Sequence, residues 1–126
     1  MRLNRFTVAA LTTMAAMASV ATMELPVQAD TLKTHNFKVT ITRNCPQGYV
    51  VCNNVTYTGT DLNTGKSIRL QGKTLHTTCA DRVTPCRFIG YEFRNKNYRY
   101  VVTESGWLRI YQGSKLLLQE QGAWDY

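Results

Sequence analysis

From residue 37 onward, apolar and polar side chains alternate in short runs that are separated by turn residues. In residues 37–42 the alternation is complete, with Phe37, Val39 and Ile41 on one side. A period of two residues is the pattern of a β-strand that buries one face. Only residues 76–84 leave room for a short helix. Further strand-like runs occupy residues 49–52, 55–58, 67–70 and 73–77.

The last third of the chain shows the clearest alternation. Its runs are joined by short connections, at residues 95–97, 104–106 and 112–115. Connections this short place consecutive strands side by side and antiparallel. We therefore predict a C-terminal four-strand meander, built from residues 87–93, 98–102, 107–111 and 116–120.

About seven or eight short strands at a spacing of roughly ten residues predict an all-β fold, either a small antiparallel barrel or a sandwich. We expect residues 31–36 to be a loose lead and residues 121–126 to be a frayed tail. The alternation also predicts which side chains of the meander share a face, namely Ile89, Tyr91 and Phe93 on its first strand and Tyr98, Tyr100 and Val102 on its second.

Residues 1–29 have the layout of a secretory signal peptide. Two arginines near the start precede an uncharged, alanine-rich stretch over residues 6–23, and a small-residue pattern then ends at Ala29. We predict cleavage after Ala29, so that residues 30–126 form a single secreted β domain. The alanine-rich stretch resembles bacterial signal peptides, which suggests a periplasmic location. The alternative is a membrane anchor that is retained.

The four cysteines lie in the predicted secreted part, at Cys45, Cys52, Cys79 and Cys86. An even number of cysteines in a small exported chain predicts two disulfides. Three pairings are possible, and we favour Cys45–Cys52 and Cys79–Cys86 because each pair brackets a turn-like segment. A zinc site made of four thiolates is the alternative. Zinc ligands usually lie closer together in sequence than the cysteines of each pair.

No arrangement of residues typical of catalysis stands out in the sequence. The two histidines, His35 and His76, have no metal-ligand neighbours at a useful spacing. We therefore predict that the protein is not an enzyme and has no cofactor and no metal site. Distant carboxylates can still meet in a fold and form an acid–base pair. The carboxylates are scattered, at Asp61, Asp81, Glu92, Glu104, Glu120 and Asp125.

The chain is basic, with 15 Lys and Arg against 8 Asp and Glu and a formal net charge of +7. Late in the sequence the basic residues interleave with aromatic ones. A cationic, aromatic face suits an anionic partner. Strand alternation alone, with aromatic side chains inward and charges outward, produces the same interleaving.

Residues 107–111 give this interpretation a specific location. Leu108 and Ile110 alternate there with larger aromatic or charged side chains. If these two residues face the core, the other three form an exposed row, and exposed aromatic residues beside arginine are typical binding anchors. If the parity is reversed, the tryptophan lies in the core instead. We predict a contact site made of Trp107, Arg109, Tyr111 and the nearby Arg99.

The function predicted from these features is that of a non-enzymatic exported module of the binding or inhibitor type. It would contact an envelope protein or another anionic partner through the basic and aromatic face. The alternative is a binder of anionic glycan or lipopolysaccharide. Nucleic acid is a poor candidate, because export separates the basic surface from it. An enzyme is the third and weakest possibility.

Ser105 and Gly106, together with residues 111–118, resemble the periplasmic lysozyme inhibitors, which are small disulfide-bonded barrels. The resemblance implies a barrel fold and inhibition of a lysozyme, and it transfers no functional residue. The positive charge opposes this function, because c-type lysozymes are themselves strongly basic and like charges repel.

Overall fold

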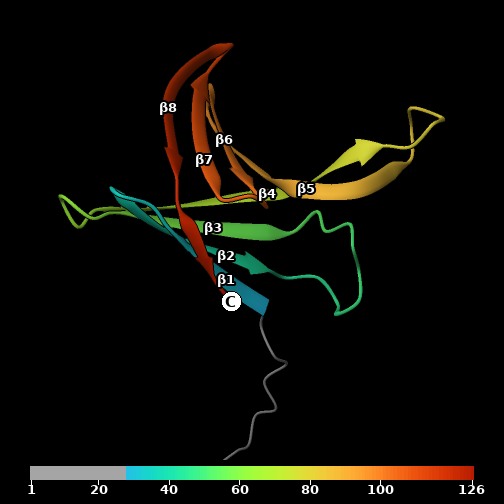
Figure 1. The fold of residues 1–126 in the computed structure, drawn as a ribbon, viewed down its shortest axis with the longest axis horizontal. Helices are drawn as coiled ribbons and strands as arrows, with labels where there is room; N and C mark the ends of the chain where they lie inside the picture. Colours follow the sequence, from blue (N-terminus) through green and yellow to red (C-terminus); the bar gives the residue numbers. More distant parts are fainter. Residues whose placement is uncertain (1–27) are drawn as a thin grey trace, which may run out of the picture.

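The computed structural model describes residues 28–126, and these form nine β-strands and no helix (Figure 1). Nearly all of the predicted signal peptide lies outside the described residues. The strands are β1 (Gln28–Lys33), β2 (Phe37–Arg43), β3 (Val55–Asp61), β4 (Ser67–Thr78), β5 (Pro85–Asn95), β6 (Tyr98–Thr103), β7 (Trp107–Gln112), β8 (Lys115–Gln121) and β9 (Ala123–Asp125).

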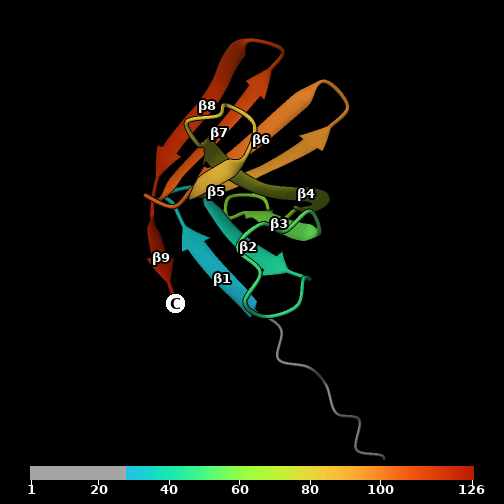
Figure 2. The ribbon, with the colours of Figure 1, turned by 90° about the vertical axis from the view of Figure 1, so that its right-hand side faces the viewer.

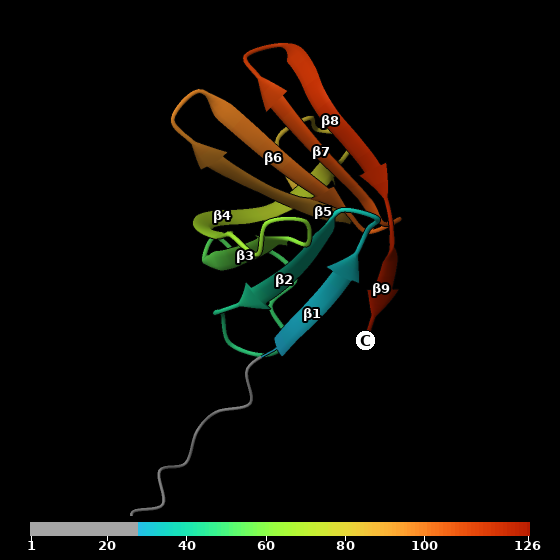
Figure 3. The same ribbon diagram turned by 90° about the vertical axis from the view of Figure 1, so that its left-hand side faces the viewer.

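All nine strands belong to one antiparallel sheet, which curls into a nearly closed barrel (Figures 2 and 3). Strands from β1 to β8 follow one another in sequence order, and β9 lies beyond β1. The all-β fold and the meander of β5 to β8 are confirmed, and the choice between barrel and sandwich is resolved in favour of the barrel.

Several details of the sequence prediction are wrong. Residues 31–36 and 121–126 are not loose, because they contribute to β1 and β9, which pair with each other. Residues 49–52 belong to a loop rather than to a strand, and residues 76–84 contain the end of β4 and a turn instead of a helix. The two runs at 67–70 and 73–77 are one long strand, β4.

The barrel interior is filled by the side chains that strand parity assigned to it. Val39 and Ile41 are fully buried, and Phe37 packs against them from the end of β2. Burial of an apolar side chain of this size stabilises the fold by roughly 1.5–3 kcal/mol. The fully buried residues of the core are Leu32, Val39, Ile41, Cys52, Val55, Tyr57, Phe93, Val102 and Leu108.

An irregularity in β5 changes which of its side chains face the interior. Tyr91 pairs with Thr74 of β4, but Phe88, not Ile89, pairs with His76, so one extra residue is inserted between them. A β-bulge of this kind shifts the alternation by one position. Phe88 therefore packs against the core beside Tyr91, and the prediction that Ile89 shares this face is wrong.

One bend at Gly122 closes the barrel. β8 pairs with β7 at one edge of the sheet, while β9 pairs with β1 at the other edge, and only Gly122 separates the two strands. A Cβ atom on Gly122 would collide with the carbonyl oxygen of Lys33, so a side chain there is excluded. Beside the bend, Glu120 accepts hydrogen bonds from Thr34 Oγ1 at 2.7 Å and Asn36 Nδ2 at 2.6 Å.

The connections divide the barrel into two different ends. We call the first the turn end, where β1–β2, β3–β4, β5–β6 and β7–β8 are joined by a few residues each. We call the second the loop end, where the β2–β3 and β4–β5 loops, the β6–β7 turn and the termini of β1 and β9 lie. Both long loops lie on the right of Figure 1 and face the viewer in Figure 2.

Candidate functional site

The parity predicted for β7 is confirmed. Leu108 is fully buried, and Ile110 packs against the core. Trp107, Arg109 and Tyr111 therefore lie on the outer face of the barrel, where all three are half-buried. Their use as a contact site stays a prediction.

Arg99 on β6 completes the row that the sequence predicted. It lies directly opposite Tyr111, and its guanidinium carbon is 4.7 Å from the centre of the tyrosine ring. The Arg109 guanidinium lies 5.1 Å from the Trp107 ring in the same way. Arg109 Nε also donates to Gln119 Oε1 at 2.8 Å. A guanidinium held over a ring keeps further N–H groups available for carboxylate or phosphate oxygens. We call Arg99, Trp107, Arg109 and Tyr111 the outer row.

A carboxylate and a shallow groove extend the outer row toward β4. Glu92 lies 3.1 Å from Arg99 and 3.6 Å from Arg94, and its side chain is only 11% exposed. One carboxylate thus pairs with two guanidinium groups, so this part of the outer face keeps a net positive charge. The groove has a volume of about 620 Å³, and its lining of amide and charged groups suits an oxygen-rich ligand: Asn53, Gln71, Gly72, Lys73, Glu92 and Arg94.

The two favoured disulfides, Cys45–Cys52 and Cys79–Cys86, are both present, and the described residues contain no free cysteine. This finding excludes the other pairings and the zinc site. Both bonds lie at the loop end, one in each long loop. Among the described residues, no group of His, Cys, Asp and Glu is arranged to hold a metal ion. The same part of the chain contains no helix that is long and apolar enough to cross a membrane.

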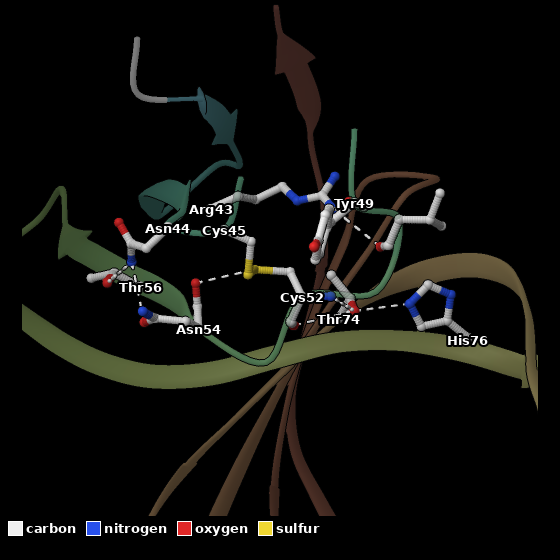
Figure 4. Close-up of a disulfide and its surroundings, with 10 residues drawn as sticks. Arg43, Asn44, Cys45, Tyr49, Cys52, Asn54, Thr56, Thr74 and His76 are labelled. Carbon is white, nitrogen blue, oxygen red and sulfur yellow. Dashed lines mark hydrogen bonds between the residues drawn. A yellow bond between two sulfur atoms is a disulfide. The ribbon is translucent and has the colours of Figure 1, made fainter. Parts of the chain in front are cut away.

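The Cys45–Cys52 loop is joined to the barrel wall by several hydrogen bonds (Figure 4). Cys52 is fully buried, its backbone N–H donates to Thr74 Oγ1 at 3.0 Å, and its carbonyl oxygen accepts from the Thr74 backbone N–H at 2.8 Å. Arg43 Nη2 donates to the carbonyl oxygens of Tyr49 and Val50 at 2.8 and 3.0 Å. The loop is therefore rigid at its base, while Tyr49 and Val50 stay exposed.

His76 lies behind this loop and not on the surface. Its Nε2 is 2.8 Å from Thr74 Oγ1, and its ring packs edge-on against Phe88. Its Nδ1 is buried with no hydrogen-bond partner among the described residues. The Thr74 hydroxyl that His76 contacts is buried and also accepts a hydrogen bond from the Cys52 backbone N–H, so the contacts of His76 are those of a residue packed in the barrel wall.

The Cys79–Cys86 loop forms the exposed tip of the β4–β5 hairpin. Asp81 accepts hydrogen bonds from the Thr84 side chain and from the backbone N–H groups of Thr84 and Val83. These bonds, led by the one from the Thr84 side chain, lower the pKa of Asp81 to about 2. The loop is thus ordered by its own contacts, with Val83 projecting into solvent at 79% exposure.

Sequence reasoning missed the groove beside the outer row. Lys73 and Glu92 are neighbours because β4 pairs with β5 in a particular register, and the alternation of either strand does not reveal this register. The exposure of Tyr49 and Val50 was missed because their apolar run was interpreted as a strand. Pro46 and Gly48 just before them were the available signal for a loop.

No known protein family, characterised protein or solved structure matches this chain. The likeness to lysozyme inhibitors therefore stays a prediction.

Proposed function

We propose that this protein is an exported binding module without catalytic activity, and that its outer row holds an anionic partner. The observation that carries the proposal is the stacking of Arg99 and Arg109 on the Tyr111 and Trp107 rings, at 4.7 and 5.1 Å. These side chains lie outside the barrel, so the core does not need them. Aromatic and arginine residues that are grouped on a surface are the usual anchors of a binding site.

The chemistry of the row and its groove favours carboxylate or phosphate groups. Arginine presents a planar fork of donors that matches either group with two parallel hydrogen bonds. The acidic surface of an envelope protein offers such groups, and so does an anionic glycan or lipopolysaccharide. Residues 30–126 contain 13 Lys and Arg against 7 Asp and Glu, and this net charge of +6 supports both, because it attracts anionic partners over distances comparable to the Debye length.

Export is the second part of the proposal. Two disulfides in a small domain are compatible with an extracellular or periplasmic location, since disulfides persist in oxidising compartments. The signal-peptide layout of residues 1–29 supports the same location. Cleavage after Ala29 would make Asp30 the first residue of β1. The four positions from Asp30 to Lys33 would keep their partners in β2.

The test is retention on a polyanionic resin as a function of salt concentration. We expect the double variant Arg99→Gln and Arg109→Gln to elute at clearly lower salt than the unchanged protein. The matched control is Lys38→Gln with Arg69→Gln, which removes the same charge from exposed positions of β2 and β4. Equal losses in the two variants would mean that net charge alone causes retention, and the outer row would lose its role.

A lysozyme inhibition assay tests the alternative function that the sequence resemblance suggests. The small disulfide-bonded barrel is the shape that the resemblance implies. The positive charge is of the wrong sign for a basic enzyme, so we expect no inhibition of a c-type lysozyme at low salt. Inhibition that disappears in the outer-row variant would instead identify the anionic partner as part of a lysozyme-like enzyme.

A further inference from the structure

The interior of the barrel opens at the loop end into a cavity of about 230 Å³. We call this cavity the loop-end mouth. It is separate from the outer row, because its walls are inward-facing side chains of β1, β2, β5 and β9, with Glu104 of the β6–β7 turn and Tyr126 after β9 at the rim. Its lining combines aromatic rings with charged groups: Asp30, Arg43, Phe88, Tyr91, Glu104, Trp124 and Tyr126.

Four of the seven residues that line the mouth are aromatic. Phe88 and Tyr91 pack edge to face with their centres 5.2 Å apart, and Trp124 and Tyr126 stack at 6.0 Å. Trp124 Nε1 donates to the carbonyl oxygen of Thr103 at 3.3 Å, which fixes the indole in place. Ring faces attract a cation that approaches within about 6 Å.

Two charged residues point into the barrel at this mouth. Asp30 lies directly opposite Ile41 in the β1–β2 ladder, so its side chain shares the inward face with this core residue. Arg43 follows Ile41 by two positions and has the same orientation. Charges that face an apolar interior are costly unless they are matched.

Two carboxylates, those of Asp30 and Glu104, and one guanidinium, that of Arg43, line the mouth, so the formal charge of its lining is −1. Arg43 already donates to two loop carbonyl groups, and Asp30 has no ion pair within residues 28–126. Glu104 at the rim lies 3.6 Å from Arg87, and both of these side chains are exposed. Burial raises the pKa of Tyr91, while Arg43 opposes the rise and Asp30 adds to it, so the phenol in the wall stays neutral.

We propose that the loop-end mouth binds one basic side chain, a Lys or Arg side chain inserted by a polypeptide partner. The aromatic wall and the Asp30 carboxylate are the two elements that recognise an alkylammonium or guanidinium group. The volume is below the roughly 300–1,000 Å³ of pockets for drug-sized ligands and suits a single side chain. The proposal does not depend on the function of the outer row.

The surroundings of the mouth favour a polypeptide over a free amine. Tyr49 and Val50, the residues whose carbonyl groups hold Arg43, are 63% and 60% exposed, and Tyr126 at the rim is 86% exposed. These apolar side chains would be covered by the residues that flank an inserted lysine, whereas a small amine would leave them in water. The loop that carries two of them is fixed by the Cys45–Cys52 disulfide, which lowers the entropy lost on binding.

The test is a titration followed by the indole N–H signals of Trp124 and Trp107 in nuclear magnetic resonance spectra. The probes are a pentapeptide with blocked ends and a central lysine, the same peptide with glutamine, and butylammonium. Moderate salt suppresses the long-range repulsion caused by the basic protein. We expect the lysine peptide to shift the Trp124 signal saturably and to leave the Trp107 signal in place.

Two variants define the contribution of the mouth. Asp30→Asn should weaken binding of the lysine peptide about five-fold, because it removes the counter-charge. Asp125→Asn is the matched control, since it removes the same charge from an exposed position of β9 and should leave affinity unchanged. Tyr126→Ala, at an exposed position where folding is not at risk, should also weaken binding.

Three outcomes would overturn the inference. The first is a Trp124 signal that does not move at tens of millimolar lysine peptide, or that moves equally with the glutamine peptide. The second is equal weakening by Asp30→Asn and Asp125→Asn. The third is an affinity for butylammonium equal to that for the lysine peptide, which would overturn the assignment to a polypeptide. None of these outcomes changes the behaviour of the outer row on a polyanionic resin.

Discussion

The two ends of the barrel are built in different ways. At the turn end, glycines with positive φ such as Gly65 and Gly113 let each strand reverse within a few residues. At the loop end, the two long connections are each closed by a disulfide over a sequence separation of 7. Local backbone chemistry is thus sufficient at one end, and covalent crosslinks hold the other.

The cavities at the two ends also differ. The turn end has a cavity of about 270 Å³ whose wall is mostly apolar, with Tyr57, Tyr100 and Ile110 in it, although Asp61 and Lys66 also line it. Burial raises the pKa of Tyr57, and neighbouring Tyr100 raises it further, so this phenol stays neutral. The wall of the loop-end mouth is instead more polar than apolar, and it contains Asp30 and Arg43. The comparison indicates that polar groups make up a larger share of the cavity wall at the crosslinked end.

The largest expected effect distinguishes the two disulfides from each other. Loops of equal length lose equal chain entropy, about 2–3 kcal/mol each in the simple model. Cys52 is also fully buried and bonded to Thr74, whereas Cys79 and Cys86 lie at an exposed hairpin tip. We expect Cys45→Ala with Cys52→Ala to lower the free energy of unfolding by about 3–5 kcal/mol, and Cys79→Ala with Cys86→Ala by about 2 kcal/mol.

Urea denaturation followed by tryptophan fluorescence measures both values. Equal losses in the two double variants would show that the buried contacts of Cys52 add nothing, and the loop end would then be held by crosslinking alone.

The next effect in size concerns Glu120, whose hydrogen bonds connect β8 to the β1–β2 turn. Glu120→Gln removes a charged acceptor that receives bonds from Thr34 and Asn36, and we expect a loss of about 1 kcal/mol. Burial tends to raise the pKa of Glu120, but the hydrogen bonds from Asn36 and Thr34 outweigh it, so the pKa is lowered.

The pH dependence of this effect follows from the direction of the shift. A lowered pKa in the folded state means that the carboxylate stabilises the fold above its unfolded value of about 4.3. This stabilisation is lost as the pH falls through the lower folded pKa. Unfolding curves of the two proteins should therefore differ at pH 7 and converge in acid. A difference that grows in acid would contradict this account.

A smaller effect tests the turn end directly. Gly65 has a φ of 78° and open space where a Cβ would lie, so Gly65→Ala introduces only backbone strain. We expect a loss of about 1 kcal/mol, because the strain falls on a turn that sets the register of β3 and β4. Gly48, with a φ of 95° in the Cys45–Cys52 loop, is the matched position at the loop end. Because the strands do not depend on it, Gly48→Ala should cost about half as much, and a larger loss there would reverse the comparison.

The smallest effect is expected at the tip of the β4–β5 hairpin. Val83→Ser should change the free energy of unfolding by less than about 0.5 kcal/mol, because the side chain is 79% exposed. Thermal unfolding of this variant provides the measurement. A clear loss would mean that the tip packs against another part of the barrel, and the second disulfide loop would then be less independent than its contacts suggest.

Strand parity and the cysteine spacing were sufficient to predict much of the fold. Leu108 and Ile110 face inward as their alternation indicates, and the local disulfides form as the turn-like segments between the cysteines suggest. These features depend on neighbours in sequence. The placement of the outer row on the barrel exterior could be predicted for the same reason.

The errors have a different origin. β9 is short, and it pairs with a strand at the opposite end of the chain, so no local pattern indicates it. The extra residue at Ile89 shifts the parity of β5, and the adjacent Gly90 was the available signal, because an isolated glycine inside a strand often marks a bulge. The loop-end mouth escaped prediction because Asp30 and Trp124 meet only when the barrel closes.

The bend at Gly122 gives the last residues an importance that their number does not suggest. A polypeptide is synthesised from its amino terminus, so β1 is made first and β9, its partner at this edge, is made last. Until then, the far side of β1 has no hydrogen-bonding neighbour and is open to pairing with other chains. Truncation of the final few residues should therefore favour aggregation of newly made protein, beyond the packing that is lost with Trp124.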